Sequence, residues 1–342
     1  MPNRVLPART TATTSKYCTT KMVVHHPRFQ ELQAKISECL EATAEAGEPQ
    51  CLCLMGETGV GKSTLVQSYA DTYPRYETKI GINIPILYVE TPHPITVKGM
   101  TSALLDALGD PRAFKGTQAE MNARLQGFLA DCAVHLVIVD DFHHLIDKKT
   151  NRILRDVSEW LKVLIKNTGI VYLVVGLEGE VEQILKANPQ LSRLFVREYL
   201  RPFIWDINDP KTIEDFARLM AYIQATTGIQ FTNEMAQPEL LFRIHYATGG
   251  VMSNLMNLFR KVRYLQGQQG ITDQPVALET LSLAYRERLQ AHVERPDPFE
   301  RAGKQALVQP FFKLADGGGA ESTGNQPPVN QKPSVMATLT TK

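Results

Sequence analysis

The first residues that could carry chemistry are those of the stretch GETGVGKS, residues 56–63, which directly follows the apolar run CLCLM. Their spacing fits the pattern G-x-x-x-x-G-K-[ST], which binds nucleotide phosphates when it joins a strand to a helix. The first backbone N–H groups of a helix have no partner within it, so they can cradle an anion. The sequence therefore predicts a phosphate-binding loop with contacts from Glu57, Thr58, Gly59, Val60, Gly61, Lys62, Ser63 and Thr64.

Two side chains of this loop have distinct expected roles. Lys62 would place its ammonium group on the β- and γ-phosphates, and Ser63 would give its hydroxyl to Mg²⁺. The alternative interpretation is a glycine-rich turn that only connects a strand to a helix.

A second candidate lies in LVIVDD, residues 136–141, an apolar run that ends in two acids. Asp140 at the tip of a buried strand would hold the hydrated Mg²⁺, and Asp141 would polarise the attacking water as general base. A solvated strand end is the alternative for Asp141. Two adjacent acids downstream of a phosphate loop favour nucleotide hydrolysis.

The elements that must position these residues alternate along the chain. Continuous apolar strands separated by amphipathic helices indicate an α/β domain whose parallel sheet is covered on both faces. The expected strands are residues 50–55, 84–90, 133–141, 170–176 and 197–207, with Pro202 favouring an edge position for the last. The expected helices of this part are residues 27–46, 59–73, 96–110, 118–132, 151–167 and 178–188.

After Asp206 the strand signals stop, and four segments of helical periodicity follow at 210–228, 233–250, 251–270 and 274–293. We expect a flexible N-terminal arm over 1–24, the α/β nucleotide-binding domain over 25–206 and a small helical lid domain over 207–293. A disordered, Pro/Gly-rich tail is expected over 294–342. Its short apolar island around Phe311 and Phe312 is a candidate partner-binding segment.

Composition narrows the class of protein. The formal net charge of the 342 residues is +1, so contact with DNA must come from a local patch of basic residues. No apolar run approaches the roughly 20 residues that span a bilayer, and we expect no membrane contact. Without a secretory signal or a disulfide framework among the five cysteines, a reducing cytoplasm is expected.

These motifs together resemble those of a known family. The loop GETGVGKST, the strand LVIVDDFHHL and the helical segment TGGVMSNLMNLF resemble the AAA+ ATPases, a class of P-loop NTPases. The segments HHPRFQEL and LSRLF resemble the TniB/TnsC branch, the ATP-dependent regulators of DNA transposition, including those of CRISPR-associated transposons. The resemblance covers residues 24–290.

The resemblance implies a fold and a way of working. The fold would be a five-stranded parallel sheet of order 5-1-4-3-2 with a small helical lid. ATP and Mg²⁺ would bind between neighbouring subunits of a homo-oligomeric ring or helical filament on double-stranded DNA, without sequence specificity. The assembly would recruit a TnsB/TniA-type transposase and meet a TniQ-type target-selection protein. Slow ATP hydrolysis would drive its disassembly, in the bacterial cytoplasm.

Further site residues are implied by matching positions. His25, His26, Pro27 and Arg28 match the segment that lies over the adenine, although a simple helix start is the alternative. Arg193 matches the arginine that a neighbouring subunit directs at the γ-phosphate, and Arg197 is a rival.

Three departures from the family pattern imply a slow ATPase. Asp141 stands where the family usually has glutamate, which places its carboxylate about one methylene farther from the γ-phosphate. Gly176-Leu177-Glu178 lacks the polar sensor that often ends the fourth strand. Ser253 and Asn254, with Arg260 beyond them, stand where the lid often carries a sensing arginine.

Sequence-independent DNA binding needs basic residues that contact phosphates. The resemblance assigns this role to Lys98, Lys115 and Thr117, and Lys148 and Lys149 beside Arg152 form a second candidate patch. The alternative for each is an ordinary solvated surface residue.

Other functions remain open at this point. One is another AAA+ switch ATPase, such as a replication-factor loader or a peptide-directed remodeller. Another is a P-loop small-molecule phosphotransferase, although such enzymes usually carry arginine-rich lids that this chain does not display.

Overall fold

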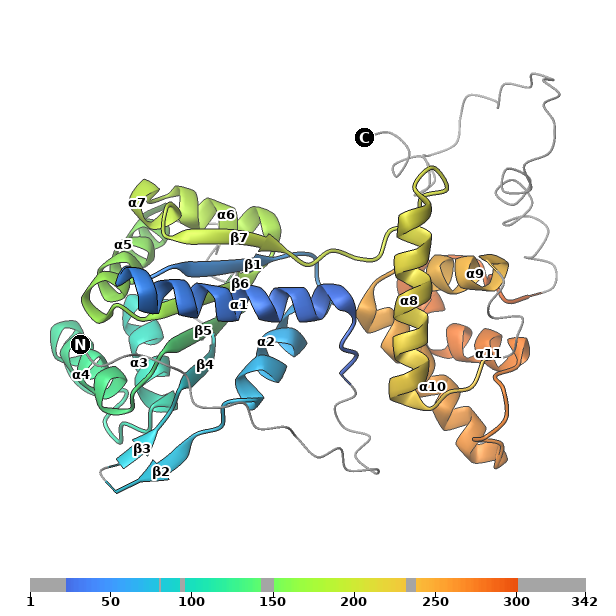
Figure 1. Ribbon diagram of the computed structural model, residues 1–342, viewed down its shortest axis with the longest axis horizontal. Helices are drawn as coiled ribbons and strands as arrows, with labels where there is room; N and C mark the ends of the chain where they lie inside the picture. Colours follow the sequence, from blue (N-terminus) through green and yellow to red (C-terminus); the bar gives the residue numbers. More distant parts are fainter. Residues whose placement is uncertain (1–22, 80, 93–95, 143–150, 232–237, 301–342) are drawn as a thin grey trace, which may run out of the picture. The chain divides into compact units, whose positions relative to one another are not determined.

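The computed structural model of the protein describes residues 23–79, 81–92, 96–142, 151–231 and 238–300, with the side chains of 151–154 and 238 not described. The chain divides into two compact units, and the division lies between Arg201 and Pro202. Figure 1 shows the helices and strands of the two units. Each unit has its own set of buried apolar residues. Within the described residues, none of the helices has the length and apolar character needed to cross a membrane.

The first unit is built on a five-stranded parallel sheet. Its strands in chain order are β1 (Cys51–Met55), β4 (Ile86–Glu90), β5 (Leu136–Asp140), β6 (Val171–Gly176) and β7 (Phe195–Tyr199). They lie side by side in the order β4-β5-β6-β1-β7, and β1 at the crossover pairs Leu52 with Leu173 of β6 and with Val196 of β7. Counting only these five strands, the order is 2-3-4-1-5, so the expected 5-1-4-3-2 arrangement is confirmed, read from the other edge.

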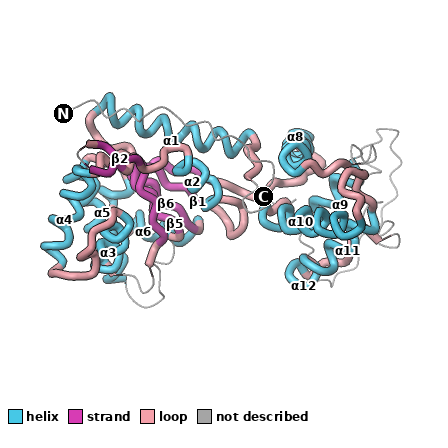
Figure 2. Tube along the Cα trace, turned by 90° about the horizontal axis from the view of Figure 1, so that it is seen from below, coloured by secondary structure: helices cyan, strands magenta, loops and turns pink. Residues whose placement is uncertain are grey.

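Helices cover both faces of this sheet (Figure 2). One face packs against α1 (Pro27–Ala46) and α2 (Lys62–Asp71). The helices of the other face are α3 (Val97–Ala107), α4 (Gln118–Asp131), α5 (Asn151–Thr168), α6 (Glu178–Lys186) and α7 (Pro189–Ser192). Successive side chains of a strand point to opposite faces, so a sheet buried on both sides needs unbroken apolar strands.

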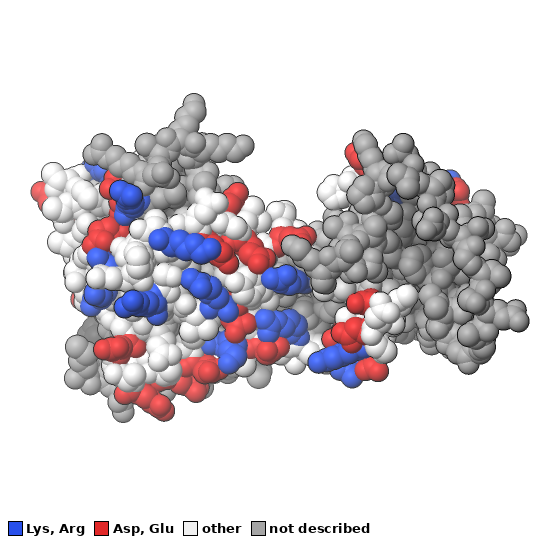
Figure 3. Space-filling view, turned by 90° about the horizontal axis from the view of Figure 1, so that it is seen from above, with Lys and Arg blue, Asp and Glu red and all other residues white. Residues whose placement is uncertain are grey.

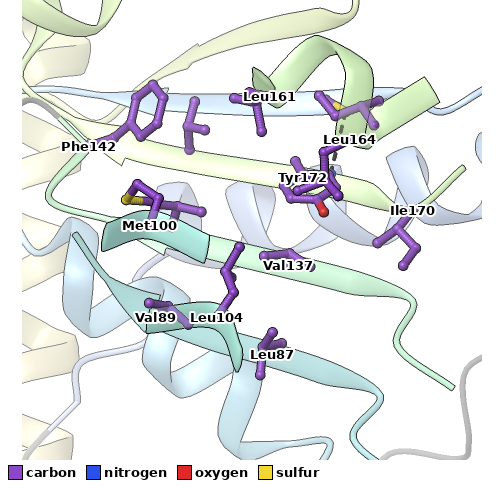
Figure 4. Packing of buried hydrophobic residues seen from close by; sticks show 14 of the residues in the cluster. Leu87, Val89, Met100, Leu104, Val137, Phe142, Leu161, Leu164, Ile170 and Tyr172 are labelled. Atoms are coloured by element: carbon purple, nitrogen blue, oxygen red, sulfur yellow. Dashed lines mark hydrogen bonds between the residues drawn. The ribbon is translucent and has the colours of Figure 1, made fainter. Parts of the chain in front are cut away.

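The core beneath α3 to α7 shows this alternation directly. Leu87 and Val89 of β4 face it together with Val137 and Tyr172 of the neighbouring strands (Figure 4). Cys51 and Cys53 face the same core, and burial raises the pKa of each thiol to about 12. These cysteines are therefore small apolar residues of the interior, as their spacing along the strand predicts.

The structure differs from the expected element plan of the first unit in three short places, one of which is the four-residue helix α7. A hairpin of β2 (Tyr76–Thr78) and β3 (Gly81–Asn83) lies between α2 and β4, where the sequence predicts no strand. The last strand ends at Tyr199 and does not run to residue 207 as expected. Leu200 still donates its N–H to the carbonyl of Met55, but Pro202 has no N–H with which to continue the ladder.

The second unit contains the expected helices, and the segment expected as one helix over 274–293 is divided into two at Leu289. Its helices are α8 (Pro210–Thr227), α9 (Pro238–Thr248), α10 (Met252–Gln269), α11 (Leu278–Arg288) and the four-residue α12 (Gln290–Val293). The chain enters this unit through an aromatic cluster, in which Trp205 packs against Phe216, Phe242 and His245.

Phe203, the second residue after the junction, is held through both its backbone N–H and its backbone carbonyl. Phe203 donates its N–H to the carbonyl of Gly250 at 3.0 Å, and its own carbonyl lies 2.7 Å from Nε2 of His245. A Cβ on Gly250 would meet the oxygen of Phe203 at 1.9 Å, so only glycine allows this approach. Burial lowers the pKa of His245 to about 4, so its ring is neutral at neutral pH.

Residues 294–300, here called the C-terminal strap, correct the expectation of a disordered tail that begins at 294. Asp297 accepts hydrogen bonds from Ser282 Oγ at 2.6 Å and from Arg286 Nε at 3.0 Å. Phe299 is 3% exposed and packs edge-on against Tyr285. The strap is thus part of the helical core, and the remaining tail, 301–342 with Phe311 and Phe312, lies outside the described residues, as does the arm over 1–22.

A matched pair of truncations tests the strap. Removal of residues 294–342 should lower the free energy of unfolding by at least about 1.5–3 kcal/mol, the usual contribution of one buried phenylalanine. Removal of residues 301–342, which keeps the strap, should lower the free energy of unfolding by less. Urea denaturation followed by circular dichroism measures both, and equal stabilities of the two variants would contradict the role of the strap.

Candidate nucleotide-binding site

The loop between β1 and α2 has the backbone geometry of an anion site. Gly59 and Gly61 have φ angles of +80° and +103°, a left-handed conformation that glycine adopts without strain. Gly61 is the N-cap of α2, and the helix begins at Lys62. The unpaired N–H groups of the first helical turn therefore lie at the end of the loop, where the helix dipole favours negative charge.

Lys62 lies folded back over this loop. Its Nζ donates to the carbonyl of Gly56 at 2.9 Å and to that of Glu57 at 2.8 Å, and the residue is 8% exposed. Burial lowers the pKa of Lys62, while the carboxylates of Asp140 and Asp141 oppose this shift. A buried ammonium needs acceptors, and these two carbonyl oxygens supply them.

Asp140 occupies the tip of β5 and is 1% exposed. One of its carboxylate oxygens accepts from the N–H of Asp141 at 2.8 Å, and the other accepts from the hydroxyl of Tyr88 at 2.9 Å. Its carbonyl accepts from both the N–H and the hydroxyl of Thr91. Hydrogen bonds from Asp141, Tyr88 and Thr91 thus fix Asp140 at the carboxyl end of the sheet.

Asp141 follows in a left-handed conformation with φ +53°, which aspartate tolerates better than most residues. It is partly exposed, and its charge acts on the Lys62 ammonium together with that of Asp140. The structure therefore brings Lys62 and the two acids together at the carboxyl end of the sheet, as the sequence predicts. Ser63 follows Lys62 on the first turn of α2.

These groups fit a magnesium nucleotide by their chemistry. Mg²⁺ is commonly held by one or two carboxylate or hydroxyl oxygens together with substrate phosphates and waters. Ser63 and Asp140 offer one hydroxyl and one carboxylate, and the helix start offers backbone donors for the phosphates. Among the residues that the structure describes, no cluster of three or more His, Cys, Asp or Glu side chains suggests a second metal site.

The start of α1 also belongs to this unit. His26 is the N-cap of α1, and its Nδ1 accepts from the N–H of Phe29 at 3.3 Å. Burial, with a smaller effect of His25, lowers the pKa of His26 to about 4. Pro27 is the first residue of the helix. The assignment of this segment to the adenine stays a prediction.

Arg28 has structural partners of its own. It donates to the Glu198 carboxylate at 3.0 Å and to the carbonyl of Tyr199 at 2.9 Å, and it forms an ion pair with Glu31. The guanidinium therefore joins the first turn of α1 to the end of β7. Sequence reasoning did not foresee this function, because Glu198 lies 170 residues farther along the chain.

The first glycine of the loop is required by a close contact. The N–H of Gly56 donates to the carbonyl of Gly176 at 3.3 Å, and a Cβ on Gly56 would meet the oxygen of Leu200 at 2.0 Å. Leu200 in turn donates to the carbonyl of Met55 at 2.8 Å. The phosphate loop is thus packed against the backbone that leaves β7.

Sequence reasoning also missed two polar side chains beside Asp140. Gln67 of α2 donates to the hydroxyl of Tyr88 at 2.9 Å, and that hydroxyl donates to Asp140. The available signals were a tyrosine within an apolar strand and a glutamine four residues after Ser63, which places both on one face of the helix.

The two candidate arginines lie around the connection between α7 and β7. Arg193 is the C-cap of α7 and is exposed, and Arg197 on β7 is exposed and donates to Ser192 Oγ at 2.8 Å. In the helical unit, Asn254 donates to the carbonyl of Thr248 at 3.0 Å, so its amide supports the turn before α10.

The candidate DNA contacts lie on surface positions. Lys98 is on the first turn of α3, and Lys115 lies in the connection between α3 and α4. Thr117 caps α4 in a capping box with Glu120, so its hydroxyl already accepts one hydrogen bond. Lys148, Lys149 and Arg152 lie outside the residues whose side chains are described.

Arg124 supports the connection that carries Lys115. Its side chain donates to the Asp110 carboxylate at 3.0 Å and to the carbonyls of Arg112 and Lys115 at 2.8 and 2.9 Å. Lys115 is therefore presented from a loop with fixed backbone. Figure 3 shows basic and acidic side chains interspersed on the visible face of the first unit. This face is not uniformly basic, so any contact with DNA there would involve a few local basic residues.

Comparison with protein families gives one match. A family model described as "Bacterial TniB protein" matches residues 14–204, which is more than half of the chain and includes the phosphate loop, both acids and Arg193. No curated protein sequence matches the chain.

Solved structures of similar fold include those of archaeal proteins. The Orc2 protein of Aeropyrum pernix in its ADPNP-ADP complexes has a TM-score of 0.57 at 14% identity, covering 80% of this chain and 71% of that one. Cdc6p of Pyrobaculum aerophilum has a TM-score of 0.52 at 15% identity, covering 83% and 73%. The Orc1 protein of A. pernix in complex with DNA has a TM-score of 0.53 at 16% identity, covering 79% and 67%. At this identity the likeness establishes the fold, which is that of the AAA+ ATPases.

The contact of Gly56 with Leu200 gives a stability prediction. Gly56→Ala should lower the free energy of unfolding by about 1–3 kcal/mol or more, because the added methyl group forces a rigid backbone to move. The control is Gly127→Ala on the exposed face of α4, where an added Cβ meets nothing within 4 Å. That change should be neutral or stabilising by up to about 1 kcal/mol. Urea denaturation measures both, and a Gly56→Ala variant as stable as the parent would refute the contact.

Proposed function

Because the chain belongs to the bacterial TniB family and has the fold of the AAA+ ATPases, we propose that it is an ATP-dependent regulator of DNA transposition. The chain is an ATPase by family and fold. The observation that carries the proposal is the convergence of Lys62, Asp140 and Asp141 at the phosphate loop, within the segment that matches the family.

Nucleotide binding would begin with an exchange of acceptors at Lys62. Its ammonium would leave the carbonyls of Gly56 and Glu57 for oxygens of the β- and γ-phosphates, while the backbone N–H groups of 58–62 surround the phosphates. Ser63 and Asp140 would hold Mg²⁺, which when bound neutralises charge on the phosphate oxygens. The segment 25–28 would lie over the adenine.

Hydrolysis would depend on Asp141 as general base. Its carboxylate would orient a water for in-line attack on the γ-phosphate and accept the proton. The side chain is one methylene shorter than glutamate, so the water would be held less closely and hydrolysis would be slow. Slow hydrolysis suits a protein whose assembly persists until its bound ATP is hydrolysed.

Assembly would follow from an arginine supplied by a neighbouring copy. The guanidinium of Arg193, with Arg197 as the rival, is exposed and permanently charged, and it can form two hydrogen bonds with phosphate oxygens. ATP at the seam between copies would then favour a ring or helical filament, and loss of the γ-phosphate would weaken the seam. The protein would therefore remain a homo-oligomer until the ATP bound between its copies is hydrolysed.

Double-stranded DNA is the proposed track of this assembly. Lys98 and Lys115 are exposed lysines on structured backbone, and Thr117 can still donate its hydroxyl hydrogen to a phosphate. Such contacts bind DNA without reading its sequence. Lys148 and Lys149 remain a second candidate patch. On the assembled DNA, the protein would recruit a TnsB/TniA-type transposase and meet a TniQ-type targeting protein, including one from a CRISPR-associated system.

A second candidate function is a replication-factor loader. It is favoured by the fold likeness to Orc2 and Cdc6p, and the DNA complex of the Orc1 protein is compatible with both functions. The family match favours transposition, since it covers the whole α/β region.

Electron microscopy of the protein with linear duplex tests the proposal. With a non-hydrolysable ATP analogue, rings or filaments should form on the duplex, and with ADP they should not, because the γ-phosphate completes the seam. Lys62→Ala should remove both nucleotide binding and assembly. Bare duplex at saturating protein, with bound analogue verified, would refute the proposal.

Two further arms examine the named residues in the same assay. With ATP, Asp141→Asn should bind nucleotide normally and keep its assemblies while those of the parent decay, and decay at the parental rate would exclude Asp141 as base. Lys98→Gln and Lys115→Gln should each weaken binding to all duplex sequences and reduce the salt slope by about one. The control is Lys186→Gln, an exposed lysine on α6.

A further inference from the structure

The hydroxyl of Tyr88 lies at a junction of three elements. Tyr88 is on β4, which pairs in parallel with β5, and Glu90 of β4 is in register with Asp140. The hydroxyl lies 2.9 Å from Asp140 Oδ2 and accepts from Gln67 Nε2 of α2 at 2.9 Å. Glu90 Oε1 is farther away at 3.5 Å, so Asp140 receives the single hydroxyl proton.

This contact joins the two elements that carry the proposed metal-holding groups. Gln67 lies four residues after Ser63, and residues i and i+4 of a helix lie one above the other on the same face. Asp140 is the last residue of β5. The chain Gln67–Tyr88–Asp140 is therefore a hydrogen-bonded strut from the Ser63 face of α2 to the tip of β5.

The hydroxyl also fixes the rotation of the Asp140 carboxylate. The backbone N–H of Asp141 holds Oδ1, and Tyr88 holds Oδ2, so the plane of the carboxylate is set by two donors. Each oxygen keeps a lone pair for a further donor, such as a water of a hydrated ion. Of the two donors, only the Tyr88 hydroxyl is a side-chain group, so only this donor can be removed by substitution.

The protonation of Tyr88 is suited to this contact. The hydroxyl of an ordinary tyrosine is protonated at neutral pH. The hydroxyl therefore keeps its proton at neutral pH and remains a donor. Since it contacts the carboxylate and not the nucleotide, any effect on hydrolysis is indirect.

We propose that Tyr88, held by Gln67, is a positioning residue that sets the orientation of Asp140 and its separation from Ser63 for Mg²⁺-bound ATP. This inference rests on the proposed assignment of Ser63 and Asp140 to the metal. Ligands that are oriented by outer hydrogen bonds lose affinity for the metal when those bonds are removed, typically 10- to 100-fold.

Tyr88→Phe removes the hydroxyl and keeps the ring. The measurement is the binding of an ATP analogue with a fluorescent ribose substituent, titrated with Mg²⁺. The Mg²⁺ concentration for half-maximal enhancement of binding should rise on the order of 10-fold, while affinity for the analogue without metal stays unchanged. Gln67→Leu should raise the same half-maximal Mg²⁺ concentration. The double variant should raise it by less than the two single changes combined, because both changes break the same strut.

The matched control is Tyr69→Phe on the same helix. The Tyr69 hydroxyl lies 3.0 Å from Ser37 Oγ of α1, so its removal breaks a contact of α2 that does not involve Asp140. This variant should keep the parental Mg²⁺ dependence. An equal shift in Tyr69→Phe and Tyr88→Phe would mean that α2 has only become looser, and would overturn the inference.

Two other results decide the matter. Parental Mg²⁺ dependence in both Tyr88→Phe and Gln67→Leu overturns the positioning role while leaving the proposed function intact. Asp140→Asn identifies the other failure: if it too keeps the parental Mg²⁺ dependence, the assignment of Asp140 to the metal is wrong and the positioning role falls with it. Should Tyr88→Phe fail to fold, Gln67→Leu alone carries the test.

Discussion

The rest of the structure depends on a buried ammonium group and the oxygens that surround it. Lys62 is placed at the first turn of α2 by the loop from β1, and its Nζ is satisfied by two carbonyls of that loop. A buried cation without acceptors would be costly, so these two carbonyls stabilise Lys62 where it lies. We propose that phosphate oxygens replace them when a nucleotide binds. The parallel sheet supplies the opposing charge, because β5 ends in Asp140, Asp141 follows it, and both carboxylates act on the Lys62 ammonium.

The same loop is connected through the backbone to the start of the helical unit. Gly56 packs on the carbonyl of Leu200, and Leu200 is bonded to Met55. Two residues beyond the junction at Arg201, Phe203 is bonded to Gly250 and His245. Each unit thus fixes its own end of the connection, and only Arg201 and Pro202 lie between the fixed residues.

Local pattern was enough to predict the sheet and the phosphate loop, whereas contacts between distant residues were not predictable. Continuous apolar runs require burial on both faces, which gives the parallel sheet, and a glycine-lysine motif has one common context. The C-terminal strap was missed because a Pro-rich polar segment resembles a linker, and its order comes from Ser282, Arg286 and Tyr285. Tyr88 reads as one more strand residue, since Asp140 lies 52 positions away.

The exchange of acceptors at Lys62 is the central claim, and equilibrium binding of ATP, ADP and AMP tests it most directly. Calorimetry with Mg²⁺ and without DNA should give one site per chain for ATP and ADP. AMP should bind at least about 100-fold more weakly, because it lacks the β-phosphate and so loses charge-assisted hydrogen bonds of about 1.5–3 kcal/mol each. Equal affinity for AMP and ATP, or no binding of any of the three, would contradict the account.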